Sequence, residues 1–293
     1  MIWQDYRKLY LNALVQYSPK FKKELQRQVD TYCDTQDLYA ISDKGIKKTI
    51  KQLHIALGTK MAIISEKSVK SSVKGIRMES KSDKTDMFSY AILKVLEMDG
   101  LTTLAQDITD TTRKQIDSYI QKSMAEGLSM QETIKLLRNA GITDYRAELI
   151  ARTETGRAAN LGSQIGAINT GLVTMKEWIS AQDNRTRREP RDNTDHLHMD
   201  GVKIAMEDKF KVPNDKVGMG YELMDHPCDS KASAANVCNC RCTMGYETQR
   251  GANGQLLTYN TNPPFGRVGA IWSILQNLVG MTIGNLISEA LAD

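Results

Sequence analysis

The sequence lacks the short motifs that mark the common enzyme classes. It has no phosphate-binding glycine loop, no H-E-x-x-H motif and no arrangement that pairs a nucleophile with a base. It also lacks internal repeats and low-complexity tracts. We therefore expect a protein that is not an enzyme.

The first residues lack the pattern of a secretory signal peptide. Asp5, Arg7 and Lys8 interrupt the amphipathic stretch from Met1 to Tyr17. We therefore expect the five cysteines to lie in a reducing cytoplasm, where thiols stay free or bind metal and structural disulfides are disfavoured.

The positive charge is concentrated in one part of the chain. The net charge is only +4, but residues 41–81 carry ten basic and three acidic side chains. Within this stretch, basic residues recur at three- and four-residue steps, at Lys67, Lys70, Lys74, Arg77 and Lys81. If the stretch is helical, they line one edge that could neutralise phosphates of double-stranded DNA. A solvated face of an exposed helix explains the pattern equally well.

Residues 1–100 have a helical pattern. Trp3, Tyr6, Tyr10 and Leu14 share one helical face. Ser18-Pro19 predicts a break, because proline fits the first turn of a new helix. A second helix is then expected from the spacing of Phe21, Leu25 and Val29.

Three further helices are expected between residues 100 and 170. Thr109 or Asp110 is the expected cap of the first, which ends near Gly127. Ser129 and Glu132 form a capping box for the second. Thr143 or Asp144 is the expected cap of the third, which runs toward residues 169–171.

After Gly171 the pattern changes to short strands and polar loops. Residues 173–179 (V-T-M-K-E-W-I) have strand character, residues 251–264 are typical of a linker, and residues 268–288 carry no charge. The predicted fold class is α+β: a helical region at 1–100, a loop-rich domain with short strands at 101–250, and a linker with an apolar tail helix at 251–293.

Three clusters of residues stand in a recognisable order. R-T-E at 152–154 is followed by Asn160 and Gly162, and Trp178 is followed by D-x-R-T-R at 183–187. H-x-x-x-D-G at 196–201 precedes P-x-D at 227–229 and N-C-R-C at 239–242. Together they resemble the phage Mu F-like, head-morphogenesis family over roughly residues 105–245. The eight residues between Arg187 and His196 are more than that pattern normally allows, so a longer loop is implied.

The resemblance implies a minor structural protein of a tailed-phage head. Such a protein would lie in the virion, inside the head at the portal vertex, after assembly in the host cytoplasm. The implied partners are the portal protein and the major capsid protein, and the implied roles are head assembly and DNA packaging or exit. The alternatives are an ejected DNA-binding, membrane-active protein that assists genome entry and, with less support, a metal-dependent enzyme.

A cysteine-rich segment suggests a metal site. In an extended chain Cys238, Cys240 and Cys242 would share one face, and His196 or His198 could complete a four-coordinate zinc site. Cys228 is a further candidate ligand. The resemblance extends to His196, Cys240 and Cys242, but not to Cys228, Cys238 or His198. The competing interpretation is that Cys240 and Cys242 are small buried residues that pack the last strand.

The charged residues of the family pattern are expected to clamp a helix to a loop. We expect Glu154 to bind Arg185 or Arg187 in a charge-assisted pair. Asp183, His196 and Asp200 are expected to orient loops by hydrogen bonds. The full predicted clamp comprises Arg152, Glu154, Asp183, Arg185, Arg187 and Asp200.

The uncharged tail allows three interpretations. Its apolar residues recur at near-helical spacing, which favours docking against a protein partner such as the portal. Packing against its own chain comes second. Membrane insertion comes third, because polar residues such as Gln276 and Asn277 lower its hydropathy.

Overall fold

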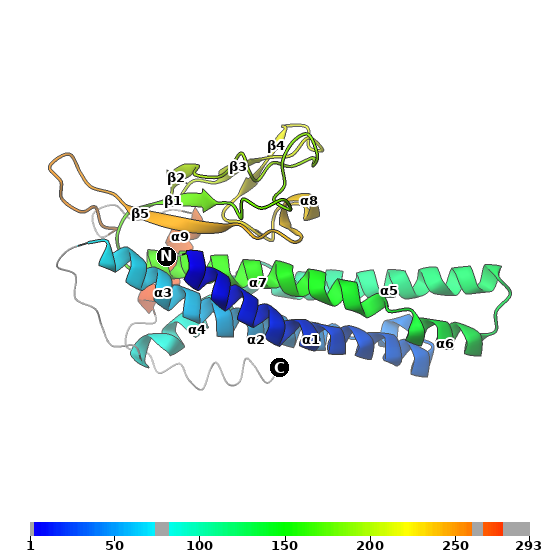
Figure 1. Ribbon diagram of the computed structural model, residues 1–293. Helices are drawn as coiled ribbons and strands as arrows, with labels where there is room; N and C mark the ends of the chain where they lie inside the picture. Colours follow the sequence, from blue (N-terminus) through cyan, green and yellow to red (C-terminus); the bar gives the residue numbers. More distant parts are fainter. Residues whose placement is uncertain (1–2, 74–81, 260–265, 278–293) are drawn as a thin grey trace.

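The computed structural model describes residues 3–73, 82–259 and 266–277 (Figure 1). The helices are α1 (Trp3–Thr35), α2 (Lys44–Leu53), α3 (Thr59–Ser71), α4 (Ser82–Met98), α5 (Leu101–Ala125), α6 (Met130–Asn139), α7 (Ile142–Ile168), α8 (Ala234–Val237) and α9 (Gly266–Asn277). The strands are β1 (Thr174–Ile179), β2 (Lys203–Ala205), β3 (Phe210–Pro213), β4 (Tyr221–Met224) and β5 (Thr243–Thr248). The predicted α+β class is confirmed, with helices first and short strands later.

The strands form a layer on one side of the helices (Figure 1). β1 pairs antiparallel with β2 on one edge and with β5 on the other, while β3 and β4 form a separate antiparallel pair. Side chains of β1 alternate between buried and half-buried, which is the period of a strand with one face toward the core. The strand that we predicted at 173–179 is therefore confirmed.

α1 passes through Pro19 without a break, so the predicted separation into two helices was wrong. Proline removes the hydrogen bond to the carbonyl four residues earlier, which belongs to Val15. Val15 is 76% exposed, so water can reach that side of the helix. Tyr17 and Phe21 on the opposite face are 3% and 0% exposed, and their burial offsets the loss.

α5 begins at Leu101, eight residues before the predicted cap at Thr109. Gly100, with φ of 86°, provides the turn that precedes the helix. Thr109 is fully buried, and its hydroxyl accepts a hydrogen bond of 2.8 Å from Gln28 of α1. The hydroxyl therefore serves a contact between helices and not a cap. The predicted Ser129–Glu132 capping box is confirmed at the start of α6.

α7 is the element that the other parts share. α1 and α3 both pack along it, and the sheet lies against it through β5. α2 joins α3 through a π-helical turn, His54–Gly58. A Cβ atom at Gly162 would lie 2.2 Å from the carbonyl oxygen of Gly58. One at Gly166 would lie 2.1 Å from that of Ala62, so α7 meets this segment nearly backbone to backbone.

Two apolar clusters join residues from both sides of the predicted boundary at residue 100. The first contains Phe88 and Ile92 of α4 with Leu161 and Ile165 of α7. The second contains Phe21 and Leu25 of α1, which pack with Ala151 and Ala158 of α7. Residues 1–100 therefore share their core with the following segment.

The structure does not support a separate apolar tail. Val268, Ile271 and Leu275 of α9 are buried in the first cluster, so this part of the tail packs on its own chain. Tyr259, in the predicted linker, is 2% exposed in the same cluster. Residues 278–293 lie outside the described part. Within that described part, no helix combines the length and the apolar character needed to cross a membrane.

We predict that Gly162→Ala lowers the free energy of unfolding by about 1–3 kcal/mol, because the added methyl group would overlap the Gly58 carbonyl. The sign of the change distinguishes the two effects, because helix propensity alone would make alanine more stable than glycine by about 1 kcal/mol. Urea unfolding measures the change. Gly218→Ala is the matched control, because nothing lies within 4 Å of its added Cβ. An unchanged or more stable Gly162→Ala protein would contradict the close helix contact.

Candidate metal centre

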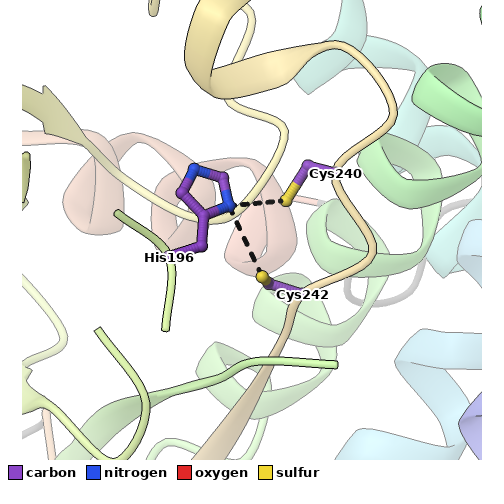
Figure 2. Close-up of side chains that lie close together, drawn as sticks. All are labelled: His196, Cys240 and Cys242. Atoms are coloured by element: carbon purple, nitrogen blue, oxygen red, sulfur yellow. Dashed lines mark hydrogen bonds between the residues drawn. The ribbon is translucent and has the colours of Figure 1, made fainter. Parts of the chain in front are cut away.

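The side chains of His196, Cys240 and Cys242 point toward one another (Figure 2). His196 lies in the long loop between β1 and β2, and the two cysteines lie between α8 and β5. The Nδ1 atom of His196 is 3.5 Å from Sγ of Cys240 and 3.6 Å from Sγ of Cys242. The three possible ligand atoms lie within 4.8 Å of one another, and all three residues are buried. This cluster could hold a metal ion.

The hydrogen bonds around His196 orient its ring toward the sulfurs. Its Nε2 atom is 3.0 Å from Oδ1 of Asn236, whose amide nitrogen donates to Glu222 Oε2 at 2.6 Å. Because the amide oxygen only accepts, Nε2 donates this hydrogen bond, and Nδ1 faces the two cysteines. Histidines that bind metal usually donate their other ring nitrogen in this way. Trp178 packs edge-on against the ring, with centroids 5.3 Å apart.

One of the thiols is disposed to ionise. Hydrogen bonds from Cys228 and Cys242 hold the pKa of Cys240 well below its ordinary value. The hydrogen bond between Cys228 and Cys240, together with burial, raises the pKa of Cys228. Burial raises the pKa of Cys242. Cys240 is therefore the thiol of the group that ionises most readily. A thiolate is the form of cysteine that binds metal.

Helix α7 holds the loop that carries the two cysteines. The side-chain amide of Asn160 donates to the carbonyl oxygens of Pro227 and Cys242, both at 3.1 Å. Arg157 donates to the carbonyl of Cys228 at 3.0 Å. Thr153 accepts from the backbone amide of Asn239 at 3.1 Å. One face of α7 thus binds the chain at several points between residues 227 and 242, which we call the cysteine loop.

Cys228 and Cys238 lie outside the three-residue cluster. The predicted alternation of Cys238, Cys240 and Cys242 was wrong, because Asn239 has a positive φ of 60° and turns the chain between them. Cys238 is half-buried, and burial raises its pKa. Cys228 is fully buried beside Gly156, with its Sγ 3.5 Å from the Cys240 carbonyl.

The predicted pairing of Glu154 with Arg185 or Arg187 was wrong. Glu154 points into the helical layer, where its carboxylate accepts from Arg157 at 2.6 Å and lies 3.2 Å from Nε2 of His54. Burial by itself would raise the pKa of Glu154, but the Arg157 charge and the His54 hydrogen bond outweigh it and lower the pKa. The i,i+3 spacing of Glu154 and Arg157 was the signal that could have identified this pair.

The other predicted clamp residues mostly form contacts within loops or along their own helix. Arg152 pairs with Glu148 on the exposed side of α7. Arg187 donates to the carbonyl of Cys238, and Asp183 pairs with Arg241. Asp200 accepts from the backbone amide of Ser180 at 2.7 Å and from Gln182 at 2.5 Å. Arg185 is exposed.

The predicted DNA-binding edge is described only in part. Lys67 is exposed on α3, and Lys70 pairs with Glu66 at 2.7 Å. α3 ends at Ser71. Lys74, Arg77 and Lys81 lie outside the described residues, so DNA contact by this edge stays a prediction.

A buried lysine on β1 was missed in the sequence. Lys176 is 0% exposed, and its ammonium group donates to the carbonyl of Asp225 at 2.9 Å. It also lies 5.4 Å from the ring centre of Phe210. Burial lowers the pKa of Lys176 to about 8. Its alternation with Trp178 on β1 placed it on the buried face, but a lysine at such a position is expected to be exposed.

Comparison with protein families identifies the segment that carries this centre. Residues 114–245 match the family model described as "Phage Mu protein F like protein". This segment is similar to the phage Mu F-like family, and we refer to it as the Mu F-like domain. The match indicates a phage head morphogenesis protein and, with it, a component of the virion. No curated protein and no solved structure matches the chain.

The Mu F-like domain contains both partners of the contact described above. It begins inside α5 and ends inside β5, so it includes α7 and the cysteine loop that α7 holds. Within the R-T-E segment, Thr153 binds the loop and Glu154 faces the helical layer. Asn160, further along α7, also binds the loop. α1 to α4 lie outside the match and complete the helical core.

We predict that wild-type protein gains about 2 kcal/mol of stability relative to Lys176→Met between pH 7.5 and 9.5. The pKa of Lys176 is about 8 in the folded protein and 10.5 ordinarily. The unfolded chain therefore binds more protons in this range, and stability rises with pH. Chemical denaturation at the two pH values measures the difference. The exposed Lys211→Met is the control, and equal pH dependence in both variants and wild type would contradict the assignment.

Proposed function

We propose that the chain is a minor structural protein of a tailed-phage head, which lies inside the capsid near the portal. In this position it contacts the portal protein and the major capsid protein, and it acts in head assembly and in DNA packaging or exit. The observation that carries this proposal is the Mu F-like match over residues 114–245. Two residues of the family pattern, Glu154 and Asn160, also support a structural role. Both are buried, and both form hydrogen bonds with other residues of the chain.

We further propose that His196, Cys240 and Cys242 bind a structural zinc ion. Two sulfurs and one imidazole nitrogen are ligands that zinc prefers, and they would fill three of its four tetrahedral positions. The fixed ring nitrogen and the disposition of Cys240 to ionise fit the same ion. The apolar cluster around the centre is small, and it includes both cysteines. A bound ion would therefore stabilise loops that have little core of their own.

For the head protein, we expect purified particles of the parent phage to contain the chain. Mass spectrometry of the particles detects it, and the chain should resist external protease until the capsid is opened. A deletion mutant should form fewer DNA-filled particles, and a plasmid copy should restore them. Absence of the chain from washed particles, or its digestion on intact ones, would contradict the proposal.

For the zinc site, we expect about one zinc ion per purified chain. Removal of the ion by a strong chelator should lower the melting temperature by about 10 °C, as expected for an ion present at about 1,000 times its dissociation constant. Elemental analysis and thermal melts provide the two measurements.

The control for the zinc site is a cysteine outside the cluster. Cys240→Ser should lose the ion, whereas Cys238→Ser should keep it, because Cys238 lies two residues away and outside the group. A fully folded wild-type protein without zinc, which melts equally with and without chelator, would exclude the zinc and favour cysteines that only pack.

A further inference from the structure

A pocket of about 210 Å³ lies between the first turns of α1 and the loop that follows β1. Tyr6, Arg7 and Tyr10 line it from α1, and Asp183, Arg185 and Arg241 line it from the Mu F-like domain. The pocket therefore exists only where the N-terminal helix and the domain meet. It is separate from the three metal-centre side chains, none of which lines it.

The tyrosines give the pocket a rigid aromatic wall. Tyr6 and Tyr10 are 3% and 7% exposed, and their rings stack with centroids 6.1 Å apart at 24°. The hydroxyl of Tyr10 donates to the carbonyl of Arg152 on α7 at 3.3 Å. These rings are held in place before any ligand arrives, so little conformational entropy is lost when one binds.

The charges of the pocket are predominantly positive. Arg241 and Asp183 neutralise each other, with a 2.7 Å bond between Nη2 and Oδ1. Arg7 and Arg185 are exposed, and neither guanidinium group forms an ion pair or hydrogen bond with a residue in the described part of the chain. Two guanidinium groups are thus available beside an aromatic wall. Arginine and tyrosine are enriched among the residues that dominate protein interfaces.

We propose that this pocket binds an acidic segment of a partner protein. A carboxylate of the segment pairs with Arg7 and Arg185, whose planar groups suit bidentate binding of carboxylates. A neighbouring apolar side chain lies against Tyr6 and Tyr10. A peptide fits better than duplex DNA, because the pocket is a hollow of side-chain size with an aromatic wall that a phosphate backbone would not use. This binding would follow from the pocket alone and does not depend on the phage-head role.

The test measures peptide binding to the full chain by fluorescence anisotropy. The probe is a labelled peptide of alternating glutamate and leucine, and its twin carries glutamine in place of glutamate. We expect the acidic peptide to bind at least about tenfold more tightly than its twin, and we expect the double variant Arg7→Gln with Arg185→Gln to lose at least about tenfold in affinity. Each single variant should lose part of the affinity, and circular dichroism checks that each is folded.

The matched control is Arg188→Gln. It removes the same charge from the same loop, is exposed, and does not line the pocket. Its affinity should stay within about twofold of wild type, as expected for a charge outside the contact. No binding of the acidic peptide, an unaffected double variant, or an equal loss in Arg188→Gln would overturn the proposal. So would a short DNA duplex that binds more tightly than the peptide and depends on the same two arginines.

Discussion

The two hydrogen bonds from Asn160 to the carbonyl oxygens of Pro227 and Cys242 are the interaction on which the cysteine loop depends. These carbonyls are 15 positions apart in the chain, and one buried amide group holds both. Arg157 adds a bond to Cys228 and is itself held by Glu154. Since buried polar groups are costly without partners, the helix and the loop satisfy each other only in this arrangement.

The same helix joins the Mu F-like domain to the rest of the chain. Gly162 and Gly166 remove the side chains that would separate α7 from Gly58 and Ala62. At this contact His54 reaches Glu154, so the residue that holds Arg157 for the loop is bound in turn by the N-terminal region. Two small residues on one helix and a polar pair beside them therefore couple two parts of the chain that are far apart in sequence.

Sequence patterns identified the parts of the structure that depend on local interactions. The capping box of Ser129 and Glu132 needs residues only three positions apart, and the strand at β1 follows from alternating side chains. Where a distant contact outweighed a local preference, the patterns failed. Pro19 lies within a helix because Tyr17 and Phe21 are buried on the other face, and Thr109 binds Gln28 and does not cap a helix.

The sequence by itself determined the α+β class and the Mu F-like resemblance, and it placed His196, Cys240 and Cys242 among a larger set of candidate metal ligands. It could do so because order and spacing along the chain carry that information. Only the tertiary structure decided the partners of Glu154, the exclusion of Cys238 from the cluster, and the packing of α9 on its own chain. Each of these depends on which surfaces meet across many residues, and a single positive φ at Asn239 is enough to reverse the side chains that alternation predicts.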